Sequence, residues 1–167
     1  MDALAPAHAQ AGEVQVAIMN HGVRSAKESG VDAEVGYVTA PIVRLRDVGA
    51  PRLLVGFSAN DRGGVSFGSA ALVWRRRLAG RLQGEFQFGY AIHNGKLDTR
   101  DPEIARRHLL LGSRDLFRTA IGLDLSLGRG SRVGIYGVHL SHGQVLGRGR
   151  NQGLNAIGVR FTREISR

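Results

Sequence analysis

Short runs in which apolar and polar residues alternate recur along this chain, and they predict β-strands. The longest run covers residues 82–92, where one face carries mainly large apolar residues and the other carries Gln, Glu, Gly and Ala. A period of two places successive side chains on opposite faces of a strand. The same division recurs over residues 117–127. Both segments are therefore predicted to be strands with one apolar and one polar face.

The whole chain, read in the same way, contains eight such strands separated by glycine-containing turns. The predicted strands cover residues 14–21, 32–39, 52–59, 65–76, 81–92, 114–127, 132–142 and 153–164. Eight antiparallel strands suffice for a small membrane barrel, because closure of the sheet leaves no unpaired edge. The predicted fold class is all-β, an eight-stranded antiparallel transmembrane β-barrel. A soluble barrel of the lipocalin type also alternates, but its apolar face points inward.

The polar faces predict which side of the barrel wall meets lipid. Gln83, Glu85 and Gln87 follow one another on one face, and Arg118 and Asp124 share a face of another strand. Such side chains fit a narrow lumen filled by hydrogen bonds and ion pairs. The Phe and Leu face is then predicted to meet lipid.

Loop lengths predict the orientation of the barrel. Bacterial barrels keep periplasmic turns short and outer loops long. Residues 77–80 and 128–131 are short turns, whereas three long segments rich in Lys and Arg alternate with them: residues 22–31, 93–113 and 143–152. The basic end is therefore predicted to be the outer one.

The composition narrows the choice of partners. Lys and Arg total 23 against 14 for Asp and Glu, a formal charge of +9 that suits nucleic acid, anionic lipid or a phosphorylated glycolipid. There is no cysteine, and the closest histidines, His139 and His142, would point to opposite faces of one strand. Neither a metal nor a cofactor is predicted. The glycine-rich stretch around Arg148 and Arg150 is a single copy in a β-patterned chain, so nucleic acid is not the predicted partner.

The chain divides into a short leader and one domain. Residues 1–11 are rich in alanine, and Ala7-His8-Ala9 has the small-x-small pattern of a signal cleavage site. This segment is expected to be either the last part of a secretory signal peptide or a disordered tail. Residues 12–167 are predicted to form a single β-barrel domain.

His139 and Ser141 form the candidate chemistry of this sequence. They are two positions apart on one predicted strand, so the imidazole and the hydroxyl lie on the same face. On the lipid-facing side, at the outer end, a hydroxyl nucleophile and its base could meet an acyl ester. Asn155 begins the next strand at the same end and is the candidate for the group that orients the histidine. Isolated His-x-Ser pairs are common in sequences, so the pair alone is also compatible with two residues that have no catalytic role.

Motifs in the second half of the chain add to this prediction. They read Ala91-Ile92-His93-Asn94-Gly95-Lys96-Leu97, Gly112-Ser113-Arg114-x-Leu116-Phe117-Arg118, His139-x-Ser141, and Asn151-x-Gly153-Leu154-Asn155-x-x-Gly158-Val159-Arg160. In this order they resemble the motifs of the lipid A 3-O-deacylase (acyloxyacyl hydrolase-like) family. The resemblance covers about residues 88–161. The resemblance implies a barrel of the bacterial outer membrane. It also implies hydrolysis, without a metal, of the ester-linked 3-hydroxyacyl chain at the 3-position of lipid A.

The resemblance also implies roles for single residues. Carried over by position, Ser141 is the nucleophile and His139 the general base. Asn155 stands where the family has an acidic residue, and an amide can hold the ring but cannot stabilise imidazolium by charge. The family usually has Asn directly after the serine, where it helps to stabilise the oxyanion, and this chain has His142 instead.

The remaining site predictions concern residues around this core. The candidates for oxyanion stabilisation or substrate positioning are His142, Gly143 and Asn151. The candidates for contact with lipid phosphate are Arg148, Arg150 and Lys96, because basic side chains attract phosphates.

Three functions remain open. The first is an outer-membrane esterase acting on lipid A or lipopolysaccharide, with outer-membrane lipid around it. The alternative is a catalytically impaired barrel of the same family, with a structural or lipopolysaccharide-binding role, which the residues at 142 and 155 make credible. The third is a soluble β-barrel that binds a small ligand or nucleic acid. A homo-oligomer is compatible with the sequence.

Overall fold

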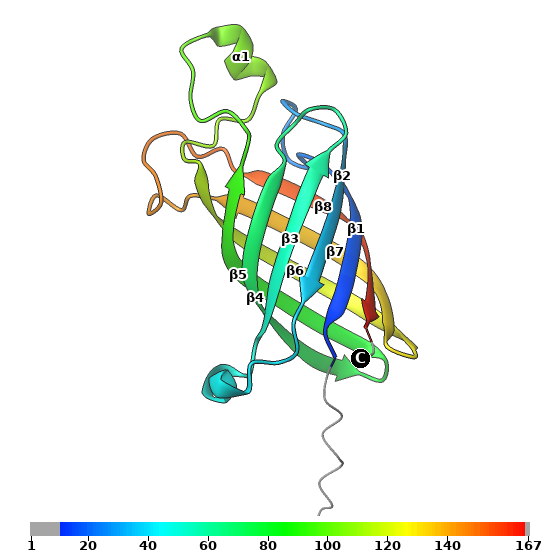
Figure 1. Cartoon of the computed structure of the whole chain (residues 1–167). Helices are drawn as coiled ribbons and strands as arrows, with labels where there is room; N and C mark the ends of the chain where they lie inside the picture. The colour runs from blue at the N-terminus through cyan, green and yellow to red at the C-terminus, as the bar shows by residue number, and fades with distance from the viewer. Residues whose placement is uncertain (1–10, 166–167) are drawn as a thin grey trace, which may run out of the picture.

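Eight antiparallel strands close into one barrel in the computed structural model, which describes residues 11–165 (Figure 1). The strands are β1 (Glu13–Asn20), β2 (Val31–Val38), β3 (Arg52–Asn60), β4 (Phe67–Ala79), β5 (Leu82–His93), β6 (Asp115–Gly128), β7 (Ser131–Ser141) and β8 (Leu154–Glu164). Each strand pairs with its neighbours in sequence, and β1 pairs with β8 to close the ring. The prediction of an eight-stranded antiparallel β-barrel is confirmed. Residues 1–10 of the predicted leader lie outside the described residues.

Short turns gather at the end of the barrel where β1 begins and β8 ends. The β6–β7 hairpin turns through Arg129 and Gly130, which have φ of 50° and 72°. Two successive positive φ values match the right-handed twist of a two-residue hairpin. The β2–β3 connection at this end is longer and contains a 3-10 helix, η1 (Val43–Val48). The indole Nε1 of Trp74 donates to the carbonyl of Val48 at 2.7 Å and so ties η1 to β4.

The long loops lie at the opposite end, as Figure 1 shows. The β5–β6 loop contains a short helix, α1 (Pro102–Arg107), which the pattern of apolar residues did not predict. Its first turn is capped by the Asp101 carboxylate, which accepts from the amide of Glu103 at 2.8 Å. No helix in the described part of the chain is long and apolar enough to cross a membrane.

Charged side chains fill the interior of the barrel. Arg118 is fully buried and pairs with Glu34 at 3.3 Å, and it donates a hydrogen bond to the hydroxyl of Tyr136. Arg160 is equally buried, pairs with Glu85 and with Asp124, and stands over the ring of Tyr136. The prediction that the polar faces line the lumen is therefore confirmed for these strands.

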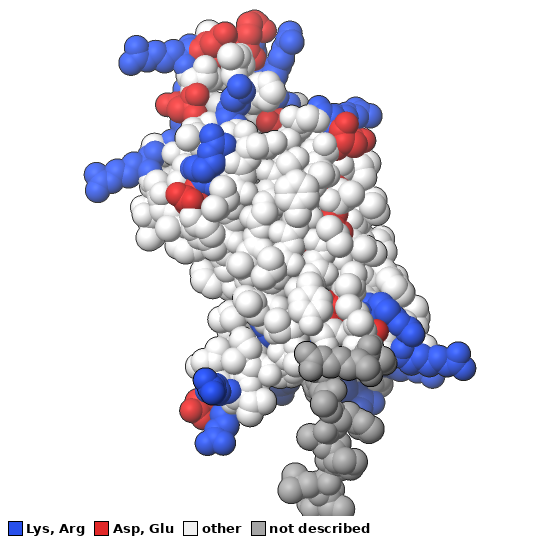
Figure 2. Space-filling model, viewed as in Figure 1, with Lys and Arg blue, Asp and Glu red and all other residues white. Residues whose placement is uncertain are grey.

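Apolar side chains cover the outside of the wall. The exposed ones on the strands include Val16, Ile18, Val35, Val55, Phe57, Phe86, Phe88, Ile92, Ile121, Leu123, Leu125, Ile135, Ile157, Val159 and Phe161. Figure 2 shows the result as a largely uncharged belt between two ends that carry Lys, Arg, Asp and Glu. An outward apolar band above a polar interior is the arrangement of a transmembrane barrel.

Replacement of Arg118 by leucine should test the lumen network. The change leaves the Glu34 carboxylate buried without its cation, and we expect the free energy of unfolding to fall by about 3–5 kcal/mol. Urea titration of the barrel in lipid vesicles, followed by the fluorescence of Trp74, measures this loss.

The matched control is Arg62→Leu, which removes the same charge from an exposed loop residue. We expect a change within about 0.5 kcal/mol there. Equal effects of the two variants would show that the buried arginine does not stabilise the barrel.

Candidate functional site

The candidate catalytic residues lie on the outer face of the barrel, near the end that carries the long loops. His139 and Ser141 lie at the C-terminal end of β7. The strand register places Asn155 of β8 directly opposite His139 on one side, and Thr119 of β6 opposite it on the other. His139 is exposed, and Ser141 and Asn155 are half-buried. The alternation that puts charges in the lumen thus turns these residues outward.

A hydrogen bond joins two of them. The Nδ1 atom of His139 lies 2.9 Å from Oδ1 of Asn155. Because an amide oxygen only accepts, Nδ1 carries the proton and Nε2 is left as the acceptor. Ser141 follows two residues later on the same face, a separation of roughly 7 Å along the strand. The strand therefore carries an imidazole with an acceptor Nε2 and a hydroxyl on one outward face.

An apolar groove runs along the wall from these residues. It has a volume of about 440 Å³ and is bordered by β6, β7, β8 and the β1–β2 loop. Its lining consists of Val23, Arg24, Thr119, Ala120, Ile121, Gly137, Val138, His139, Asn155, Ala156 and Ile157. The amide of Val23 donates to the carbonyl of Asn155 at 2.9 Å, which fixes the β1–β2 loop against β8. His139 and Asn155 therefore meet at the loop end of an apolar surface on which an acyl chain could lie.

His142 faces away from His139, as the alternation of the strand predicts. Its side chain is buried, with Nδ1 accepting from the amide of Gln144 at 3.1 Å and Nε2 donating to the carbonyl of Arg150 at 3.1 Å. The next residue along a strand points to the other face, so this ring faces away from Ser141. The prediction that the His142 side chain assists at an oxyanion does not fit this position. Its ring instead organises the β7–β8 loop.

The other two oxyanion candidates also belong to this loop. The Asn151 side chain accepts from the amide of His142 at 3.3 Å. Gly143 has φ of 60°, a conformation that suits glycine, and a Cβ atom added to it would lie 3.3 Å from the ring of Phe117. Their assignment to an oxyanion remains a prediction.

The predicted phosphate contacts lie outside the groove. Arg150 pairs with Asp98 at 3.5 Å, and Arg148 is exposed on the β7–β8 loop. Lys96 borders a separate depression beside Glu28. The cation that does line the groove is Arg24, which the sequence showed only as one of several basic loop residues.

Glu28 connects the β1–β2, β3–β4 and β5–β6 loops, and sequence reasoning missed it. Its buried carboxylate accepts from the amides of Val65 at 3.2 Å and of Leu109 at 3.1 Å, and it contacts Nε2 of His21 at 3.2 Å. Nδ1 of His21 lies 2.8 Å from the Asp32 carboxylate. No local motif marks these residues, because their partners come from the β3–β4 and β5–β6 loops.

The histidine in this cluster is held in its charged form. Burial by itself lowers the pKa of His21, but hydrogen bonds to Asp32 and Glu28 outweigh burial and raise the pKa to about 9. Burial raises the pKa of Glu28, and its contacts with His21 and with the two loop amides more than offset this and lower it. The loop end is therefore stabilised by a buried ion pair.

Comparisons with known proteins identify the fold. No family model and no curated protein matches the sequence. Among solved structures, the chain is similar to the outer membrane enzyme PagL, with 19% identity, a TM-score of 0.65 and coverage of 92% of this chain and 99% of that one. It is also similar to a designed transmembrane β-barrel (10% identity, TM-score 0.55, 93% and 96% coverage). A second designed barrel, TMB2.3, gives 7% identity, a TM-score of 0.54 and coverage of 96% and 99%. At these identities the likeness shows a shared barrel fold.

The pKa of His21 predicts how stability depends on pH. The folded value of about 9 lies above the ordinary value of 6.5, so the stabilisation is complete below about pH 6.5 and is lost as pH rises through 9. We expect the midpoint of thermal unfolding in detergent to fall between pH 6.5 and 9.5. The His21→Gln variant should show a flatter profile over this range. Identical profiles for the two proteins would contradict this role of His21.

Proposed function

We propose that this protein is an esterase of the bacterial outer membrane that removes the ester-linked 3-hydroxyacyl chain at the 3-position of lipid A. The observation that carries the proposal is the contact of His139 with Asn155 at 2.9 Å at the end of an apolar groove, with Ser141 two residues further along the same strand face. The resemblance of the motifs to the lipid A 3-O-deacylases supports it, and so does the likeness of the fold to the outer membrane enzyme PagL.

The proposed reaction is an acyl transfer to Ser141 followed by hydrolysis. Oγ of Ser141 attacks the ester carbonyl carbon while Nε2 of His139 takes the hydroxyl proton. The tetrahedral intermediate then collapses, the bond to the sugar oxygen breaks, and His139 returns the proton to that oxygen. A water molecule, activated by the same histidine, cleaves the acyl-serine ester and releases the fatty acid. Asn155 holds the ring in the tautomer that this sequence of steps requires.

The position of the groove suits a lipid substrate. Ile121, Gly137 and Ile157 extend it along the membrane-facing wall below His139, so the acyl chain can remain in the apolar layer during the reaction. Arg24 lies at the loop end of the groove, where the phosphorylated sugar of lipid A would be found. A guanidinium there would pair with a lipid phosphate and align the ester with the serine.

A second candidate function follows from one residue. Asn155 carries no charge, so the imidazolium that forms during proton transfer receives no ionic stabilisation from it. A barrel of this kind could bind lipopolysaccharide through the same groove and basic loops without rapid hydrolysis.

The Ser141→Ala variant separates these two functions. If the proposed reaction occurs, incubation of detergent-solubilised protein with purified lipid A should remove one hydroxyacyl group, as shown by the mass of the lipid. We expect the variant to lose at least about 10³-fold in rate, because the nucleophile is absent. An unchanged lipid with the native protein over a range of detergents and pH would favour the binding role. Equal hydrolysis by both proteins would exclude Ser141 as the nucleophile.

The Asn155→Glu variant tests whether the amide limits the rate. A carboxylate at this position would stabilise the imidazolium by charge, and we expect hydrolysis to rise by about tenfold or more. The control is Gln152→Glu, which adds the same negative charge to the neighbouring β7–β8 loop. Oε1 of Gln152 accepts from the amide of Leu110, and a glutamate oxygen can accept there as well. A rise in both variants would indicate a general effect of charge. No rise in Asn155→Glu would show that the orienting group is not what limits catalysis.

A further inference from the structure

A second pocket opens at the opposite end of the barrel, where β1 begins and β8 ends. It has a volume of about 320 Å³, room for roughly ten water molecules. Its lining comes from six strands and the η1 connection: Glu13, Pro41, Gly49, Ala50, Arg52, Val73, Arg75, Arg77, Gln83, Arg132 and Glu164. The proposed ester hydrolysis uses none of these residues.

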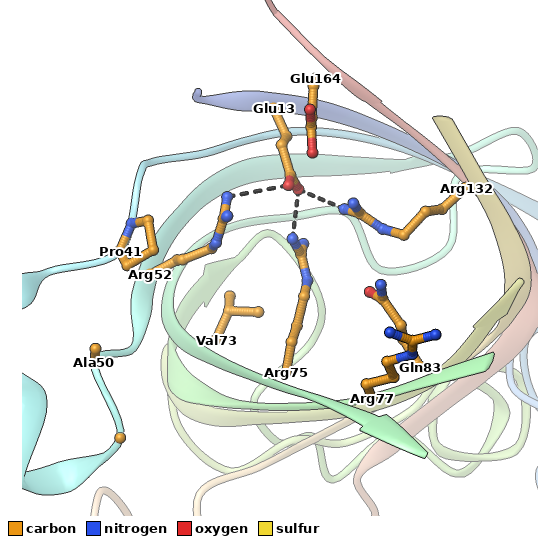
Figure 3. A pocket seen from close by; sticks show the side chains of 11 residues that line it. Glu13, Pro41, Ala50, Arg52, Val73, Arg75, Arg77, Gln83, Arg132 and Glu164 are labelled. Atoms are coloured by element: carbon orange, nitrogen blue, oxygen red, sulfur yellow. Dashed lines mark hydrogen bonds and ion pairs between the residues drawn. The ribbon is translucent and has the colours of Figure 1, made fainter. Parts of the chain in front are cut away.

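The pocket carries more positive than negative charge. Its lining contains four arginines and two glutamates, which leaves an excess of two positive charges. Glu13 pairs with three of the arginines. Its Oε1 accepts from Arg52 at 3.0 Å, and its Oε2 accepts from Arg75 at 2.5 Å and from Arg132 at 2.6 Å. Figure 3 shows these three guanidinium groups converging on the one carboxylate.

A further carboxylate, Glu85, lies outside the pocket lining and is already shared. Arg75 also pairs with Glu85, but Glu85 pairs at the same time with the buried Arg160. Arg77 has no ion-pair partner among the described residues, and its Nε donates to the carbonyl of Gly80 at 2.7 Å. Within the described residues, Glu13 and Glu85 are therefore each shared among several guanidinium groups.

Hydrogen-bond donors in the pocket are also left over. Nη2 of Arg75 and Nε of Arg132 are buried and have no hydrogen-bond partner within the described residues. The side chain of Arg132 is 8% exposed and that of Arg75 is 13% exposed. A buried guanidinium donor without an acceptor is costly, so an anion that supplies oxygen atoms here would be stabilised.

The geometry points to a binding site for a soluble, phosphate-sized dianion in this pocket, with Arg75, Arg77 and Arg132 as its donors. Phosphate offers several acceptor oxygens to planar guanidinium groups and balances the two excess charges. Arg75 and Arg132 point inward from the strands, away from the lipid-facing wall, so the ligand enters from the aqueous phase at the mouth. Glu164 borders the same mouth and opposes anion binding.

Calorimetric titration with inorganic phosphate tests the site. The full chain is held in an uncharged maltoside detergent, which brings no phosphate of its own, and sodium chloride keeps the ionic strength constant. We expect saturable binding to the native protein. Arg77→Gln should weaken it by about fivefold because one exposed guanidinium is lost, and Glu164→Gln should strengthen it by about threefold because an opposing charge is removed. Neither change removes an ion pair that the structure shows.

Arg81→Gln is the matched control, because it removes one positive charge at the same end of the barrel but outside the pocket lining. We expect its affinity to equal that of the native protein. Equal weakening by Arg77→Gln and Arg81→Gln would overturn the proposal, because only the net charge of this end would then matter. The absence of saturable binding to the native protein would also overturn it. Lipid A hydrolysis is a separate readout, so either result leaves the proposed esterase to its own test.

Discussion

The ion pairs inside the barrel are the constraint on which the rest of the structure depends. A ring of eight strands leaves an interior just wide enough for side chains, and the outer wall must be apolar where it meets lipid. Charged residues on the strands therefore have to be accommodated inside and neutralised there, as Arg118 and Arg160 are by Glu34, Glu85 and Asp124. Since these side chains occupy the middle of the lumen, the pockets described above lie at the outer wall and at the two ends.

Much of this architecture could be predicted from the sequence because it depends on local periodicity. Alternation located all eight strands and assigned their two faces, and it correctly put Glu85 and Arg118 inside. Partner choice in the lumen could not be obtained in this way. Arg118 and Glu34 are 84 positions apart, and Glu13 meets Arg132 only because β1 closes against β8, next to β7. Pairing of this kind depends on the register of the closed ring, which no short segment of sequence specifies.

In the candidate site, too, some features follow from local periodicity and others depend on long-range contacts. The spacing of His139 and Ser141 follows from one strand, and the contact of His139 with Asn155 follows from the order of neighbouring strands. Alternation predicted that His142 faces away from His139, but its part in the β7–β8 loop depends on Arg150 and Gln144 in a segment without periodicity. Likewise, Val23 and Arg24 reach the groove because a hydrogen bond fixes their loop against β8.

The outward position of His139 and Ser141 determines how a substrate would reach them. A group on the lipid-facing wall is approached sideways, by molecules diffusing within one leaflet, and not by collision from the surrounding solution. For the proposed esterase, the rate would follow the mole fraction of substrate among its neighbouring lipids, whatever the bulk concentration. Tight packing of that leaflet would slow the exchange of product for substrate, so the physical state of the membrane would govern turnover alongside the chemistry of the site.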